Sequence, residues 1–167
     1  MDKNITIRRA GRADAPAVHR LLVETWHDTY DGQMGPEDVT KITDAWHTVE
    51  KLTAQMETDG HLFLIAEMDG VLAGHVYALE ETLSALNLSR LYVLPAAQGQ
   101  GMGRALLREL EKHFEGAQTI RLEVHQEQHQ AHRFYEASGF QIIGKTAHCG
   151  GDSDVPALIM EKKLGRQ

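Results

Sequence analysis

A glycine-rich segment over residues 98–104, QGQGMGR, constrains this chain more than any other stretch. The apolar run before it, residues 89–94, predicts a strand, and the leucine spacing after it predicts a helix. Glycines let a backbone approach a ligand closely, and the first N–H groups of a helix are unpaired and carry partial positive charge. Such a loop suits a phosphate or pyrophosphate, and Arg104 adds a cation beside it.

Two common phosphate-binding loops do not fit this spacing. A nucleotide P-loop needs a Lys-Ser or Lys-Thr pair after its glycines, and no such pair follows here. A dinucleotide-binding loop reads G-x-G-x-x-G, whereas residues 99–103 read G-x-G-x-G without an acidic residue at the usual later position. The ligand is therefore expected to be a pyrophosphate-bearing cofactor of a different kind.

Composition limits the classes of protein that this chain can belong to. Its 167 residues, 42% hydrophobic and 25% charged, predict a single globular domain over 1–167. The first residues lack a signal-peptide layout, no apolar run is long enough to span a membrane, and Cys149 is the single cysteine, so we expect a cytoplasmic protein with no membrane partner. The net charge of -7 disfavours nucleic acid and weakly favours cationic substrates such as amines.

Hydrophobic periodicity predicts the remaining elements. We expect Asp14 to cap the first helix, Asp69-Gly70 to form a hairpin turn, and Gly139 to end the last helix. The apolar stripes predict that Trp26 and Trp46 are core residues. Strands are predicted over 5–8, 61–68, 71–79, 86–94, 119–124, 140–143 and 157–160, and helices over 14–31, 36–56, 102–114 and 130–138, with a glycine-rich turn at 150–152. This order, β-α-α-β-β-β-α-β-α-β-β, predicts a mixed α/β sheet with helices on its faces.

Two motifs in this order resemble a known family. Residues 98–103 fit the pattern Gln/Arg-x-x-Gly-x-Gly/Ala, and residues 134–140 read FYEASGF at a helix end. Together they resemble the GCN5-related N-acetyltransferases, the GNAT superfamily, and the element order is similar over nearly the whole chain. Residues 26–30 and 154–162 resemble, less specifically, small bacterial members such as the polyamine and ribosomal-protein acetyltransferases.

The resemblance implies a GNAT fold, with splayed middle strands and helices on both faces, that uses acetyl-CoA and no metal. In the family, the strand before the loop pairs with the pantetheine arm and the loop binds the pyrophosphate. Family members commonly have Asn where this chain has Gln128, which offers the same amide chemistry. The implied cofactor-binding residues are Leu91, Tyr92, Val93, Gln98, Gly99, Gln100, Gly101, Met102, Gly103, Arg104, Gln128 and Tyr135.

The same resemblance implies two catalytic residues. Tyr135 is the candidate general acid, because acetyl transfer to an amine expels a thiolate that needs a proton. Glu123 is the candidate base, since it lies twelve residues before Tyr135, as the base does in ribosomal-protein N-acetyltransferases. Alternation along the strand leaves open a purely solvated position for Glu123, and Glu80 or Glu81 are alternative bases.

A metal site is not expected. Of His125, His129 and His132, only the last two would share a helix face, and no cysteine cluster supports a zinc site.

The acceptor is left open between several classes. A small primary amine such as a polyamine is the first hypothesis, and a protein N-terminus or lysine side chain is the second. A non-catalytic acyl-CoA sensor or interaction module is a third hypothesis, although Tyr135 and Glu123 together favour an enzyme. A homodimer is a further hypothesis drawn from the resemblance.

Overall fold

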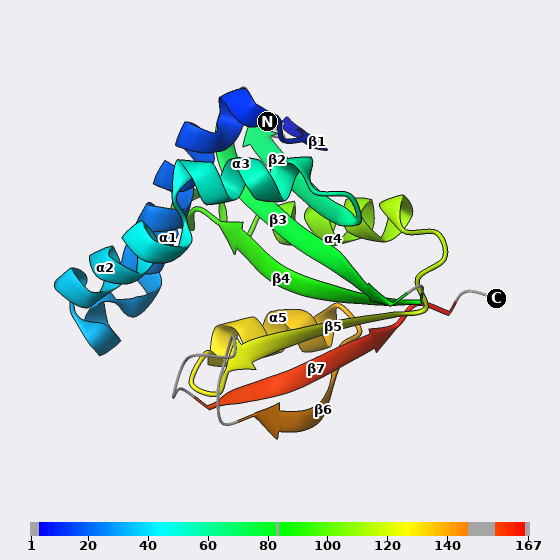
Figure 1. The fold of residues 1–167 in the computed structure, drawn as a ribbon. Helices are drawn as coiled ribbons and strands as arrows, with labels where there is room; N and C mark the ends of the chain where they lie inside the picture. The colour runs from blue at the N-terminus through cyan, green and yellow to red at the C-terminus, as the bar shows by residue number, and fades with distance from the viewer. Residues whose placement is uncertain (1–3, 83, 147–155, 166–167) are drawn as a thin grey trace. The chain divides into compact units, whose positions relative to one another are not determined.

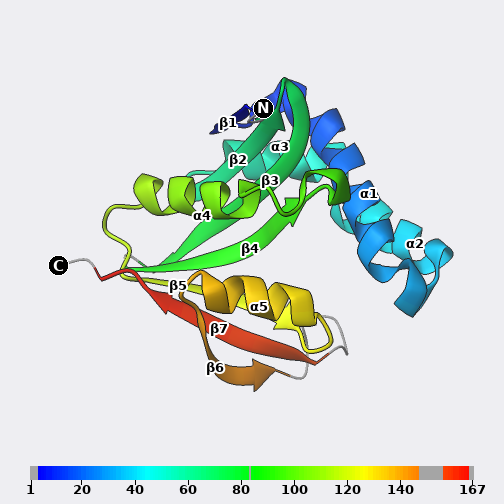
Figure 2. The same ribbon diagram turned by 180° about the vertical axis from the view of Figure 1, so that it is seen from behind.

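The computed structural model describes residues 4–82, 84–146 and 156–165. Its elements, shown in Figures 1 and 2, are β1 (Ile5–Arg9), α1 (Ala15–Met34), α2 (Pro36–Trp46), α3 (Val49–Glu57), β2 (His61–Met68), β3 (Val71–Thr82), β4 (Ala85–Val93), α4 (Met102–His113), β5 (Thr119–His125), α5 (His129–Ala137), β6 (Gln141–Thr146) and β7 (Ala157–Lys163). Among the described residues the strands pair in the order β1-β2-β3-β4-β5-β7-β6. Cys149 and the turn predicted at 150–152 lie outside the described residues.

The chain divides into two compact units. The first comprises Met1–Tyr77 and Arg90–His113, and the second comprises Ala78–Ser89 and Phe114–Gln167. Strands β3 and β4 therefore contribute residues to both units. The assignment of residues 1–167 to one domain stays a prediction.

In the first unit, helices cover both faces of the strands. Strand β1 pairs antiparallel with β2, from Ile5 opposite Met68 to Arg9 opposite Leu64. Helices α1 and α3 lie on one face, with α2 packed against α1, and α4 lies on the other face (Figures 1 and 2). Gly74 on β3 allows close packing of α4, because a Cβ at this position would lie 2.7 Å from the sulfur of Met102. The residues that follow the glycine-rich loop are thereby fixed against the sheet.

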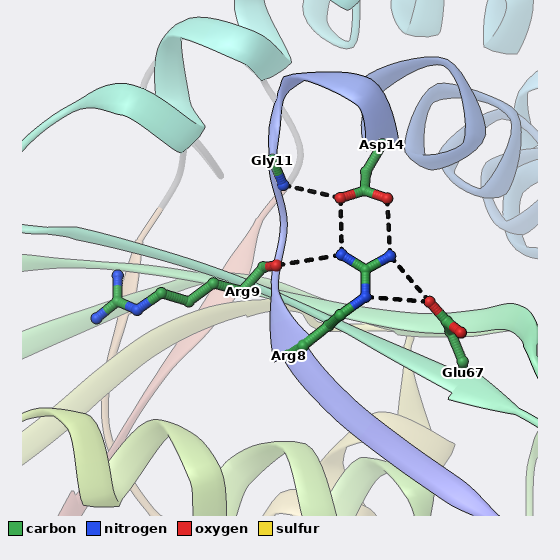
Figure 3. A network of polar contacts seen from close by, with 5 residues as sticks. All are labelled: Arg8, Arg9, Gly11, Asp14 and Glu67. Carbon is green, nitrogen blue, oxygen red and sulfur yellow. Dashed lines mark hydrogen bonds and ion pairs between the residues drawn. The ribbon is translucent and has the colours of Figure 1, made fainter.

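A polar network joins β1, β2 and the start of α1 (Figure 3). Both terminal nitrogens of Arg8 donate to the carboxylate of Asp14 at 2.9 Å, and Nη2 also donates to Glu67 at 2.9 Å. Asp14 stands at the predicted N-cap position of α1, but its carboxylate accepts from Gly11 N–H at 2.8 Å rather than from a helix N–H. The hydrogen bonds from Arg8 hold the pKa of Asp14 below its ordinary value.

In the second unit, β5 is the central strand. It runs parallel to β4 over Ala85–Asn87 and antiparallel to β7 over its whole length, while β6 pairs with the other edge of β7. Helix α5 covers one face of these strands (Figure 2). Gly139 ends α5 with φ of 101°, as predicted for this position.

Two features of the helices differ from the predictions. Helix α1 continues through Gly32 to Met34, and Gly35 with φ of 88° ends it. The stripe predicted over 36–56 is two helices, because the chain leaves the α-conformation at His47 and Thr48 then caps α3.

The core assignment of Trp26 is confirmed, but that of Trp46 is wrong: Trp46 ends α2 with 43% of its surface exposed, and His47 is buried instead.

We predict that Asp14→Ala lowers the free energy of unfolding by about 1–2 kcal/mol, because it removes a partly exposed ion pair and a hydrogen bond to Gly11. Urea unfolding at neutral pH measures this loss. Since the folded pKa of Asp14 is lowered, the contribution is complete above its unfolded pKa of about 4 and disappears as the pH falls through the folded pKa. The exposed Asp28→Ala is the control. An equal loss at neutral and strongly acidic pH would contradict the role of the ion pair.

Candidate active site

The first unit presents the glycine-rich loop at the start of a helix. Gly99 and Gly101 have φ of 77° and 85°, in the left-handed region that favours glycine, and a Cβ at either position would have nothing within 4 Å. The first helical bond runs from Ala105 N–H to Gly101 C=O at 3.0 Å. The N–H groups of residues 102–104 precede this bond, which is the arrangement that anions favour at helix N-termini.

Two glutamine side chains brace this loop. The amide of Gln98 donates to the carbonyl of Val93 at 3.0 Å, and that of Gln100 donates to the carbonyl of Ala96 at 3.2 Å. These bonds tie the loop to the end of β4 and to the turn after it. Gln98 and Gln100 therefore hold the loop backbone in place with their side chains, and Arg104 is exposed at the start of α4.

The strand before the loop has half-buried side chains that pack against the N-terminal helices. Leu91, Tyr92 and Val93 are half-buried on β4. Tyr92 packs against the buried cluster of Trp26, Tyr30 and Val39 from the N-terminal helices. The predicted pantetheine contact needs only backbone groups of this strand, so it is compatible with this packing.

The second unit holds the candidate acid. Tyr135 lies on α5, and its ring makes edge contacts with Phe134 and Phe140, at centroid distances of 5.2 and 5.4 Å. The buried Phe140 also donates its N–H to the carbonyl of Tyr135 at 3.0 Å. The FYEASGF motif thus packs the half-buried tyrosine ring against the residue that follows its helix. Gln128 lies at the N-cap position of the same helix.

The candidate base lies on β5 of the same unit. Glu123 is exposed between the buried Leu122 and Val124, opposite Ile159 of β7. Its exposure agrees with the alternation that left a solvated position open, and it also leaves the carboxylate accessible to water. The alternative base Glu81 is exposed as well, and it accepts a hydrogen bond from Asn87 at 3.0 Å.

The three histidines around β5 and α5 have structural contacts. His132 Nε2 donates to the carbonyl of His125 at 3.0 Å, which joins α5 to the end of β5. Burial lowers the pKa of His125. Within residues 4–82, 84–146 and 156–165, no group of three or more His, Cys, Asp or Glu side chains could hold a metal ion.

The sequence-based site did not include Arg90, one residue before the predicted pantetheine contacts. Its side chain donates from Nη2 to Gln55 at 2.5 Å and from Nε to His75 at 3.2 Å. The signal that could have found it is the single charged residue in the strand segment LSRLYVL, residues 88–94.

Comparison with known proteins agrees with this geometry. Residues 30–164 match the family described as Acetyltransferase (GNAT) domain. The PaiA N-acetyltransferase of Thermoplasma acidophilum, solved in complex with coenzyme A, is 28% identical and superposes with a TM-score of 0.87 over 96% of this chain and 99% of its own. Peptidyl-lysine N-acetyltransferase YiaC of Escherichia coli (strain K12) is 29% identical over 82% of this chain and 84% of its own. Aminoglycoside N(6')-acetyltransferase type 1 of Stenotrophomonas maltophilia is 30% identical over 81% and 86%.

The chain belongs to the GNAT acetyltransferase family. The predicted fold class is confirmed, and the protein is an acetyl-CoA-dependent N-acetyltransferase. The loop fits the cofactor, since two open glycines in the left-handed region precede a helix N-terminus, an arrangement that suits a pyrophosphate. No helix in the described part of the chain is long and apolar enough to cross a membrane.

We predict that Gly101→Glu abolishes coenzyme A binding, because it adds a strained, negatively charged side chain to the loop expected to hold the pyrophosphate. Isothermal titration calorimetry measures the affinity. Gly60→Glu is the matched control, since Gly60 also has an open, positive-φ position, with φ of 80°, but lies outside the loop. Retained binding in Gly101→Glu would place the cofactor elsewhere.

Proposed function

We propose that this enzyme transfers the acetyl group of acetyl-CoA directly to the primary amine of a small molecule. The observation that carries the proposal is the glycine loop at the start of α4, in a chain that belongs to the GNAT family. A polyamine is the first candidate acceptor, since a net charge of -7 attracts cations at long range.

The chain supplies binding and proton transfer for this reaction. Acetyl-CoA, when bound, supplies the acetyl group as a thioester. The backbone of residues 91–93 would hold the pantetheine arm, and residues 98–104 would hold the pyrophosphate. Glu123 takes the proton of the ammonium group, directly or through water, because a primary amine with a pKa of about 10.4 is mostly protonated at neutral pH. Tyr135 Oη gives a proton to the departing thiolate.

A peptide amine is the second candidate acceptor. YiaC, which shares 29% identity with this chain, is a peptidyl-lysine N-acetyltransferase, and the other relative acts on aminoglycosides. The acceptors named for these relatives thus include both protein side chains and small molecules.

The test of this function is thiol release from acetyl-CoA against polyamines, aminoglycosides, amino acids and peptides with free N-termini or lysines. Acetyl-CoA-dependent release with a small amine supports the proposal. Release with peptides alone would replace the first acceptor class with the second. No release with any amine, while acetyl-CoA still binds, would count against amine acetylation.

We predict that Tyr135→Phe lowers kcat by about 10²–10⁴-fold, the usual contribution of a positioned general acid, with little change in acetyl-CoA affinity. Steady-state kinetics and calorimetry measure the two quantities. Tyr30→Phe is the control, because it removes a hydroxyl from a buried tyrosine in α1 that has no proposed catalytic role. Unchanged turnover in Tyr135→Phe would remove Tyr135 from the mechanism.

We further propose a cytoplasmic homodimer. The support is the family resemblance alone, and size-exclusion chromatography with light scattering tests the oligomeric state. A monomer mass would contradict the dimer.

A further inference from the structure

Arg90 on β4 is held by neutral partners. An arginine N–H can only donate, so His75 Nε2 must accept the bond from Arg90 Nε at 3.2 Å. The proton of His75 therefore lies on Nδ1, which donates to the carbonyl of Leu64 at 3.2 Å. Burial, with a contribution from Arg90, lowers the pKa of His75 well below its ordinary value. His75 is thus a neutral acceptor and does not compensate the charge of Arg90.

The guanidinium also lies against two aromatic rings. Its central carbon is 4.6 Å from the ring centroid of Tyr77 and 5.7 Å from that of Phe63, both within cation–π range. Tyr77 in turn is hydrogen-bonded to His61. These contacts fix the orientation of the guanidinium before any ligand arrives.

Within the described part of the chain, Arg90 has no carboxylate partner. Among the described residues, no Asp or Glu forms an ion pair with it, in contrast to Arg8, which has two carboxylate partners. Burial lowers the pKa of Arg90 to about 10, and the groups that oppose this effect are Tyr92 and Tyr77. Arg90 is still protonated at neutral pH. An enclosed cation without a counter-charge is costly, and such groups in native proteins call for an explanation.

The tip of Arg90 can be reached by a ligand. Nη1 has no hydrogen-bond partner among the described residues. Arg90 is half-buried as a residue, so part of it remains exposed to solvent. Nη1 and the second N–H of Nη2 form one edge of the guanidinium, which matches the two oxygens of a carboxylate.

A buried hydrogen-bond donor and a neutral histidine lie in the region near Arg90. Trp26 Nε1 can only donate, and the rings of Trp26 and His47 are 5.7 Å apart between centroids. Burial and the charge of Arg90 lower the pKa of His47 to about 3, so His47 is neutral. Tyr92, two residues after Arg90 and on the same face of β4, packs against the cluster that contains Trp26. The groups that lower the pKa of His47 electrostatically are all basic, namely Arg90, His19 and Lys51.

We propose that Arg90 binds a carboxylate of the acceptor, and hence that the acceptors are primary amines that also carry a carboxylate. This inference rests on the proposed acetyl transfer to a small amine. Within that class it favours amines that carry a carboxylate over polyamines, which carry none. Arg90 precedes Val93 by three residues, which is about 10 Å along the strand at about 3.3 Å per residue. A small molecule bound at Arg90 is therefore near the strand segment expected to hold the pantetheine arm. The net charge of -7 attracts cations only at long range, whereas Arg90 selects among small amines by direct contact.

Matched pairs of acceptors test the inference. Lysine and 1,5-diaminopentane differ only by the carboxylate, and so do alanine and ethylamine. We expect kcat/KM of the wild type to be at least about tenfold higher for the carboxylate-bearing member, as one charge-assisted bond predicts. Arg90→Gln should reduce this ratio toward one, because KM for the carboxylate-bearing acceptor rises. Arg20→Gln is the control at an exposed arginine of α1, and it should keep the wild-type ratio. A wild-type preference for the members without a carboxylate, or an unchanged ratio in Arg90→Gln, would overturn the inference.

A second variant and a binding measurement separate the ways in which this test could fail. Arg90→Lys keeps the charge but loses the bidentate geometry, so its ratio of kcat/KM values should lie between those of the wild type and Arg90→Gln. Arg90→Lys also replaces Arg90→Gln in the test if Arg90→Gln does not fold. If no amine releases thiol, the proposed function fails, and calorimetric titration of lysine into the coenzyme A-bound protein decides the inference by itself. Heat of binding in the wild type that is lost in the Arg90 variant supports it, and absence of heat in the wild type overturns it.

Discussion

The backbone at Gly99 and Gly101 is the constraint on which the binding function depends. The chain must leave β4, pass through a short turn and begin α4 with its first N–H groups available, and both glycines adopt φ values that side chains disfavour. Two features fix the loop on either side. Gln98 and Gln100 tie it back to residues 93–96, and Gly74 lets α4 pack close to β3. These contacts restrain the loop and the N-terminus of α4, and such preorganisation lowers the cost of binding an anion.

Two arginines of the first unit show how differently this fold uses the same side chain. Arg8 lies at the surface between two carboxylates and joins β1, β2 and the start of α1. Arg90 is surrounded by aromatic rings, an amide and a neutral histidine, and it remains partly exposed to solvent. The first arrangement is complete in the protein alone. Arg90 has N–H groups that form no hydrogen bond with the described residues, and it lies on the strand that leads into the glycine loop.

Much of the fold could be predicted because its signals are local. The hairpin at Asp69-Gly70 has the positive φ values that this dipeptide favours, and the strand and helix around residues 98–104 occur as expected. The break between α2 and α3 was missed because the apolar stripe continues across it in register, and only three-dimensional packing places His47 inside and Trp46 at the surface. Likewise, no described carboxylate pairs with Arg90, and since its neighbours are distant in sequence, no local pattern reveals this. The exposure of Glu123 followed from alternation along β5, but its part in proton transfer stays a prediction.

The most direct test of the central claim is a crystal structure of the coenzyme A complex. The pyrophosphate oxygens should lie about 3 Å from the backbone nitrogens of residues 101–104. A pyrophosphate bound away from this loop, with these N–H groups facing solvent, would contradict the assignment of the glycine-rich segment as the cofactor-binding element.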